Sequence, residues 1–163
     1  MTIRTASIKG VALATTFACA ASLAFGAQAA DLEVRIEGLR SADGDVRVAL
    51  HRHMEDAKFP GDAGVVGAIM RPAASGTVRV IFADVAPGAY AVAAFHDADG
   101  DGELAQNFLG MPTEGYGFSN GAVGFMGPPS FADAAVTVGE GEAMPSVSVP
   151  IAYSDAGGQG AGQ

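Results

Sequence analysis

The chain has 163 residues and a formal net charge of −9 at pH 7, with a single cysteine. This length is that of one domain of ordinary size, large enough to fold around its own core. The acidic excess disfavours nucleic acid and anionic membrane surfaces as partners, because both bind through basic patches. A net negative surface that simply keeps a protein soluble is an equally good explanation of the charge.

Residues 1–30 have the three parts of a secretory signal peptide. Arg4 and Lys9 are followed by an apolar run from Val11 to Phe25, and then by the small residues Ala27-Gln28-Ala29. This pattern predicts cleavage near Ala29 or Ala30 and a periplasmic or secreted protein with no membrane span after cleavage. A membrane anchor is the alternative, and the short, alanine-rich run disfavours it.

The single cysteine, Cys19, lies inside this segment. A lipoprotein anchor is therefore an alternative, but Thr16 stands where such anchors usually have leucine. Cleavage leaves seven basic and eighteen acidic residues, a net charge of −11, and no thiol. The absence of a thiol would exclude disulfides, a cysteine nucleophile and zinc held by cysteine.

Seven short segments of the mature chain have the composition and two-residue period of β-strands. They are residues 32–36, 46–50, 65–70, 77–82, 89–96, 134–138 and 147–151. Asp43-Gly44 lies between the first two and predicts a hairpin. Pro145 and Pro150 flank the last one and favour an edge position, because proline cannot donate to a ladder.

With no convincing amphipathic helix, the pattern predicts an all-β protein. We expect a seven-stranded antiparallel β-sandwich of immunoglobulin-like or prealbumin-like type over residues 31–153. Residues 154–163 are rich in glycine and poor in apolar side chains, which predicts a disordered tail.

Residues 97–133 lack regular periodicity and are long for a loop inside a compact domain. They hold five aromatic residues, Phe108, Tyr116, Phe118, Phe125 and Phe131. Aromatic side chains bury large areas, so we expect one long ordered loop that packs on the sandwich. A partly open aromatic surface for a ligand is compatible with that packing. The candidate binding-surface residues are His96, Phe108, Tyr116, Phe118, Asn120 and Phe125.

The run Asp97-Ala98-Asp99-Gly100-Asp101-Gly102 has the spacing of a calcium loop. Oxygen ligands at positions 1, 3 and 5, followed by glycine at position 6, suit a hard cation. The glutamate required at position 12 is replaced by Phe108, so half of the motif is present. Calcium is the candidate ion, and the candidate ligands are Asp97, Asp99, Asp101, the Glu103 carbonyl, Asn107 and Glu114. The alternative is an ion-free turn, which Asp and Gly also favour.

Gly117-Phe118-Ser119-Asn120-Gly121 matches the G-x-S-x-G pattern of serine hydrolases. That pattern requires a strand before the serine and a helix after it, and we expect neither here. The match is therefore attributed to the local abundance of glycine.

His51 and His53 form an H-x-H pair that could bind zinc or copper with His96, although exposed histidines at a strand end are the commoner explanation. His96, Asp97 and Glu114 could form an acid–base set, but nothing in the sequence supplies a substrate pocket. We assign no catalytic residue.

Several motifs resemble a bacterial secreted family known as domain of unknown function 2141. They include Asp84-Val85-Ala86-Pro87-Gly88-Ala89-Tyr90, Phe95-His96-Asp97, Glu114-Gly115-Tyr116-Gly117-Phe118-Ser119-Asn120 and Gly127-Pro128-Pro129-Ser130-Phe131. The resemblance covers about residues 31–152 and implies an exported β-sandwich without an established activity. Asp99 and Asp101 stand where the family often has asparagine, which favours an ion site in this chain.

Two function classes follow from these patterns. The favoured one is a non-enzymatic binding or interaction module of the bacterial cell envelope that displays residues 97–133 to an unknown envelope protein or small ligand. The alternative is a small metal-dependent or carboxylate/histidine-based hydrolase using His96. A structural envelope protein without a ligand is a third option, and the sequence leaves the oligomeric state open.

Overall fold

A computed structural model of the chain describes residues 28–125 and 127–154. The predicted tail beyond Ser154, and all but the last three residues of the predicted signal peptide, lie outside the described residues. Within these ranges, no helix has the length and hydrophobicity needed to cross a membrane.

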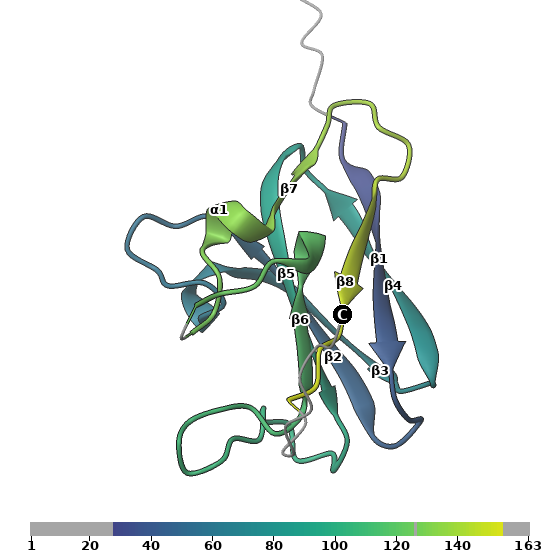
Figure 1. The fold of residues 1–163 in the computed structure, drawn as a ribbon. Coiled ribbons are helices and arrows are strands. Elements are labelled where there is room, and N and C mark those ends of the chain that lie inside the picture. The colour runs from purple at the N-terminus through teal and green to yellow at the C-terminus, as the bar shows by residue number, and fades with distance from the viewer. Residues whose placement is uncertain (1–27, 126, 155–163) are drawn as a thin grey trace, which may run out of the picture.

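Two β-sheets face each other in a sandwich, which confirms the predicted fold class (Figure 1). One sheet has the order β4-β1-β8, with β4 at Gly76–Val85, β1 at Ala30–Leu39 and β8 at Ser146–Pro150. The other sheet has the order β3-β2-β5-β6, and β7 pairs with the first half of β5. Its strands are β3 (Val65–Pro72), β2 (Asp45–Arg52), β5 (Gly88–Asp97), β6 (Gly115–Phe118) and β7 (Ala135–Val138).

The described residues contain eight strands, where the sequence predicted seven. The additional strand is β6, which lies inside the predicted loop and pairs with the second half of β5. The sheets are also not wholly antiparallel, because β8 runs parallel to β1 from Ser146 opposite Glu33 to Pro150 opposite Glu37. The predicted edge position of this last strand is confirmed.

The predicted hairpin between the first two strands is wrong. β1 pairs with β4 and β8, whereas β2 pairs with β3 and β5, so the Asp43-Gly44 turn connects the two sheets. β1 and β2 each have one apolar face. Because the chain passes from one sheet to the other between them, these two faces pack against each other in the core of the sandwich. A turn motif between two alternating segments fits either arrangement, so the turn alone did not distinguish them.

Alternate side chains of β1 and β2 form the centre of this core. Leu32, Val34 and Ile36 have no exposed surface, and Val46, Val48 and Leu50 are at most 2% exposed. Complete burial of such a side chain contributes about 1.5 to 3 kcal/mol, so these residues are a main source of the stability of the sandwich.

Residues 97–133 contain regular elements as well as β6. The 3-10 helix η2 spans Ser119–Gly121, and the short helix α1 spans Phe131–Ala134. A capping box starts α1, since Ser130 Oγ accepts from the Asp133 amide at 3.2 Å and the Asp133 carboxylate accepts from the Ser130 amide at 3.3 Å. This segment is therefore folded onto the sandwich rather than a plain loop.

The aromatic residues of this segment divide into two groups. Phe118 is buried and contacts the half-buried Tyr116 edge to face, with ring centroids 5.9 Å apart, and Phe131 packs in the same apolar cluster. Phe108 and Phe125 are 95% and 94% exposed. The expected packing of aromatic rings on the sandwich is therefore found for three of the five residues, and the rings of the other two are exposed to solvent.

A substitution of Gly117 to alanine tests how closely β6 approaches the end of β8. A Cβ atom at this position would lie 2.1 Å from the backbone carbonyl oxygen of Pro150. We expect the variant to lose about 1 to 3 kcal/mol in free energy of unfolding, because the two backbones must move apart. Denaturant unfolding measures this loss. Gly127→Ala is the matched control, since no atom lies within 4 Å of its added Cβ, and equal stability of the two variants would contradict the packing described.

Candidate functional site

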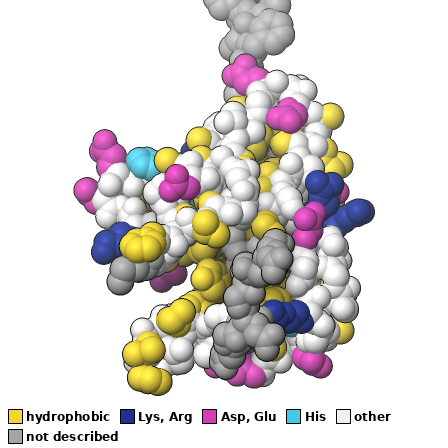
Figure 2. Space-filling view, viewed as in Figure 1, with side chains coloured by type: hydrophobic (Ala, Val, Ile, Leu, Met, Phe, Trp, Pro, Cys, Tyr) yellow, Lys and Arg dark blue, Asp and Glu magenta, His cyan; other side chains and the backbone are white. Residues whose placement is uncertain are grey.

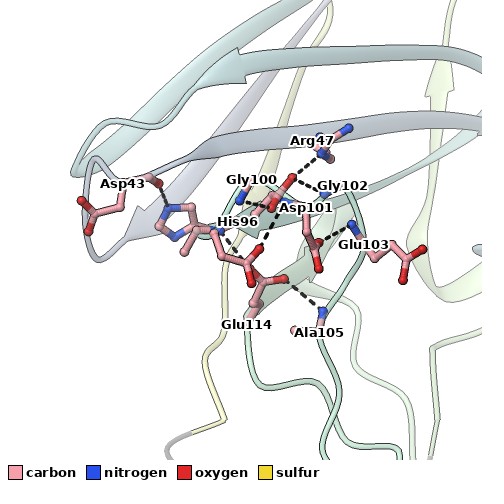
Figure 3. Close-up of polar contacts among 12 residues, drawn as sticks. Asp43, Arg47, His96, Gly100, Asp101, Gly102, Glu103, Ala105 and Glu114 are labelled. Atoms are coloured by element: carbon pink, nitrogen blue, oxygen red, sulfur yellow. Dashed lines mark hydrogen bonds and ion pairs between the residues drawn. The ribbon is translucent and has the colours of Figure 1, made fainter.

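Asp97 ends β5 and is the best-connected member of the predicted calcium loop. Its side chain is fully buried, and Oδ2 accepts from Arg47 Nε at 2.6 Å and from the Gly102 amide at 3.0 Å. Oδ1 accepts from the Gly100 amide at 2.8 Å. Figure 3 shows these contacts converging on one carboxylate from β2 and from the turn that follows β5. Asp97 therefore holds the start of the acidic loop against the sheet.

These contacts determine the charge state of Asp97. Burial alone would raise its pKa, because it disfavours the charged carboxylate. The Arg47 guanidinium and the amides of Gly100 and Gly102 outweigh burial and lower the pKa below its ordinary value. Asp97 is consequently an ionised carboxylate at neutral pH.

Three of the six predicted calcium ligands converge. One carboxylate oxygen from each of Asp97, Asp99 and Glu114 lies within 4.8 Å of the other two. Asp99 is exposed and Glu114 is half-buried. Glu114 also accepts from the Ala98 amide at 2.9 Å and from the Ala105 amide at 3.1 Å, which closes the base of the segment. The arrangement gives one face of the loop three oxygen donors.

The other three predicted ligands make contacts elsewhere in the loop. The carboxylate of Asp101 accepts from the Glu103 amide at 2.8 Å, and Glu103 is exposed. The side-chain oxygen of Asn107 accepts from the amides of Leu109 and Met111 at 2.9 and 3.1 Å, so it shapes a separate turn. None of the three belongs to the carboxylate group that the described residues bring together.

His96, a candidate for the binding surface, is 2% exposed. Its Nε2 lies 2.8 Å from the Asp43 carbonyl oxygen and its Nδ1 lies 2.8 Å from the Tyr153 hydroxyl. A carbonyl oxygen only accepts, so Nε2 donates to Asp43, and in a neutral ring Nδ1 then accepts from the Tyr153 hydroxyl. His96 thereby joins β5 to the turn between the sheets and to the C-terminal segment.

Ser119 directly follows β6 and is the first residue of the 3-10 helix η2, neither of which the sequence predicted. Its side chain is nevertheless fully buried. The hydroxyl donates to the Ala134 carbonyl at 2.5 Å and accepts from the Val92 amide at 2.9 Å. Asn120 follows it in the left-handed region, at a φ of 61°, and its side chain donates to the Ala135 carbonyl at 2.8 Å. Both side chains fasten the α1 region to the sheet.

His51 and His53 are separated by their surroundings. The first is 2% exposed and the second is exposed, and each packs edge-on against a different ring, Phe59 at 5.0 Å and Phe131 at 5.2 Å. No group of metal-binding side chains that includes either histidine is found among the described residues.

A groove lies on the outer face of the five-stranded sheet, and the sequence did not predict it. It has a volume of about 480 Å³. Cross-strand pairing aligns Ala68, Ala49, Ala93 and Phe118 in one row across β3, β2, β5 and β6. The three small side chains leave a shallow floor, which side chains of the neighbouring rows enclose. The residues that line it include Arg47, Ala49, His51, Ala93, Tyr116 and Phe118.

One sequence signal did point to this face. Residues 89–95 are Ala-Tyr-Ala-Val-Ala-Ala-Phe, apolar at consecutive positions rather than at alternate ones. A strand that is apolar on both faces is typical of one covered on both sides. Here the core covers one face of β5, and the outer face lines the groove.

Two segments project beside this face, residues 98–114 and residues 122–125 with 127–130 (Figure 1). The space-filling view shows a notch between projecting parts of the molecule, with hydrophobic side chains along it (Figure 2). The strongly exposed apolar side chains of the two segments are Phe108, Leu109, Met111, Val123 and Phe125. Of the predicted binding-surface aromatics, Phe108 and Phe125 are thus exposed on these segments, while Tyr116 and Phe118 line the groove.

The sequence pattern of one known family matches this chain. The family is described as an uncharacterized protein conserved in bacteria, DUF2141, and the match covers residues 34–145. The matched range runs from within β1 to the residue before β8. Searches of curated proteins and of solved structures returned no match.

The Asp97→Asn variant tests the buried ion pair. We expect a loss of about 2 kcal/mol in free energy of unfolding at neutral pH. The asparagine side chain is uncharged, so it cannot form the ion pair with Arg47, and it is a weaker acceptor for the two backbone N–H groups. In the wild type this contribution is complete above the ordinary pKa of 3.8 and is lost as the pH falls toward the lower pKa of the folded state. The variant should lack that part of the acid sensitivity.

Denaturant unfolding between about pH 2 and pH 7 measures both effects. Asp101→Asn is the control, because Asp101 is exposed and its carboxylate accepts from the Glu103 amide within its own turn. An Asp97→Asn variant with the stability and acid profile of the wild type would contradict the assigned role.

Proposed function

Because the chain belongs to the bacterial family of uncharacterized proteins DUF2141, which supplies no activity, we propose a function from its own surface. The protein is a non-enzymatic binding module of the cell envelope. It holds an uncharged apolar ligand of small-molecule size in the groove on the five-stranded sheet. The signal-peptide pattern of residues 1–30 supports an exported location.

The main support for this proposal is the set of residues that line the groove. A volume of about 480 Å³ is in the range of small-molecule sites. The alanine floor and the rings of Tyr116 and Phe118 offer mainly apolar contact, as such sites do. Exposed apolar side chains also lie on the two flanking segments, and exposed apolar surface of this kind is typical of binding sites.

The charges around the groove support an uncharged ligand. Arg47 lines it, but its guanidinium is paired with the buried carboxylate of Asp97 at 2.6 Å. Asp62 lines the groove near His51 and would repel an anion. A cation would lose its water against an apolar lining, at considerable cost. A neutral apolar molecule avoids both penalties.

The side chains considered for hydrolysis have structural partners. Both ring nitrogens of His96 are within hydrogen-bonding distance of other groups, and the Ser119 hydroxyl is enclosed beneath α1. Catalysis by either group would require breaking these contacts first. They therefore favour the binding module over the alternative hydrolase.

Filling the groove tests the proposal. Ala93→Phe places a ring on the alanine floor, so we expect it to weaken binding of the uncharged fluorescent probe N-phenylnaphthylamine about tenfold or more, as steric exclusion from a site requires. Fluorescence titration measures binding, and circular dichroism verifies the fold. Thr77→Phe is the matched control, because it adds the same ring to an exposed position on the opposite sheet. Absence of saturable binding to the wild type, or equal binding by both variants, would refute the proposal.

We also propose calcium as a ligand of the same module, bound by Asp97, Asp99 and Glu114. The convergence of three carboxylate oxygens within 4.8 Å supports it. Asp97 Oδ1 accepts a hydrogen bond from the Gly100 amide and retains a second lone pair for a cation, while Oδ2 stays on Arg47. The positive charge of Arg47 opposes binding, so we expect the affinity of an extracellular module, with a Kd on the order of 0.1 to 1 mM.

Calorimetry of the chelator-treated protein tests calcium binding. We expect a measurable heat and a rise in Tm on addition of about 10 mM calcium, because a ligand that binds only the folded state stabilises it. The double variant Asp99→Asn, Glu114→Gln should lose both responses. Asp101→Asn should keep them, since Asp101 lies outside the convergent group. Neither heat nor a Tm shift in the wild type would exclude the site.

A further inference from the structure

His51 is a buried polar side chain in the wall of the groove. It lies near the end of β2, is 2% exposed, and lines the groove together with Asp62 and Phe118. Its Nε2 is buried and has no hydrogen-bond partner among the described residues. Buried polar atoms are nearly always paired, so an unpaired one in a groove wall indicates a place for a ligand group.

The surroundings of His51 determine which group can pair with it. Burial lowers the pKa of the imidazole, and the nearby Asp62 carboxylate raises it by less, so the ring is neutral at neutral pH. A neutral imidazole has one nitrogen that donates and one that accepts. A partner group that can both donate and accept matches whichever role Nε2 takes.

We infer that the ligand carries an uncharged hydroxyl group that hydrogen-bonds to Nε2 of His51, while its apolar body lies on the alanine floor. This inference rests on the proposed function of the groove. A hydroxyl both donates and accepts, so it suits either tautomer of the ring. A carboxylate would face the negative charge of Asp62, and an ammonium group would be desolvated in an apolar wall. The ligand class is thus a neutral aromatic or alicyclic alcohol or phenol.

The burial of Nε2 increases the gain from this hydrogen bond. Nε2 has no hydrogen-bond partner among the described residues, so a ligand hydroxyl would replace no protein contact at that nitrogen. Contact requires a small side-chain movement at the wall, where the Phe59 ring stacks edge-on at 5.0 Å from His51. Rotamer changes of this kind are common when ligands bind.

Three probes with one aromatic skeleton test the inference: naphthalene, naphthol and naphthoate. Each is titrated into the wild type and into His51→Phe at neutral pH, with binding followed by probe fluorescence or equilibrium dialysis. We expect the ratio of naphthol to naphthalene affinity to fall about fivefold to tenfold in His51→Phe, the value of one hydrogen bond. Naphthalene itself should bind both proteins within about twofold, since it makes no such bond. Naphthoate should bind the wild type more weakly than naphthol.

Two further variants serve as controls. His53→Phe replaces a histidine that does not line the groove, so it should keep the wild-type ratio. His51→Gln retains hydrogen-bonding capacity and should recover part of the naphthol preference. Circular dichroism and thermal unfolding should show that His51→Phe is folded and no less stable than the wild type, because the substitution removes an unpaired buried nitrogen.

The outcomes separate this inference from the proposal on which it rests. If naphthalene binds in the groove but the affinity ratio is the same in the wild type and in His51→Phe, the hydroxyl assignment is overturned and the binding function stands. If Ala93→Phe leaves the binding of naphthalene and naphthol unchanged, or neither probe binds, the groove function fails. If His51→Phe does not fold, an unchanged ratio in His51→Gln relative to His51→Ala overturns the assignment.

Discussion

The ion pair between Asp97 and Arg47 is the constraint on which the site depends. A fully buried carboxylate requires partners, and this one has a guanidinium from β2 and two amides from the turn after β5. The pair therefore fastens the start of the 98–114 segment to the sheet. Gly102 contributes space as well as an amide, since its φ is 88° and a Cβ there would lie 3.2 Å from the Arg47 guanidinium. Through this anchor the segment brings Leu104 to the groove and Glu114 to the acidic group.

The same pair allows an arginine to line an apolar groove. With its charge balanced by Asp97, Arg47 forms a wall beside a row of alanines without making the site attractive to anions. The opposite face of the sheet packs into the core, so β5 is apolar on both sides. A face of this kind is stable in water when it is small, concave and partly enclosed by aromatic rings. Binding of a neutral apolar ligand is the use for which that geometry is best suited.

The sequence predicted the positions of the strands better than their pairing and register. All seven predicted strands exist. Alternation of apolar residues marked β1 and β2, each with one buried face, and short apolar runs between turn residues marked others such as β5. The sequence did not predict β6, because this strand is short and has glycine at alternate positions. An added Cβ would meet the Tyr153 ring at Gly115 and the Pro150 backbone at Gly117. Likewise, the spacing of the acidic run located a carboxylate cluster but could not reveal that Arg47, fifty residues earlier, already pairs with Asp97. The groove depends on the register of four strands, and no local pattern contains that information.

The function proposed for this protein depends on the outer face of the five-stranded sheet, which should hold an apolar ligand. NMR chemical-shift mapping of the wild-type protein with N-phenylnaphthylamine tests it most directly, since backbone amide shifts locate the bound probe. We predict that the perturbed amides cluster around Ala49, Ala93 and Phe118 on β2, β5 and β6. Shifts centred on the β4-β1-β8 sheet, or none at saturating probe, would contradict it.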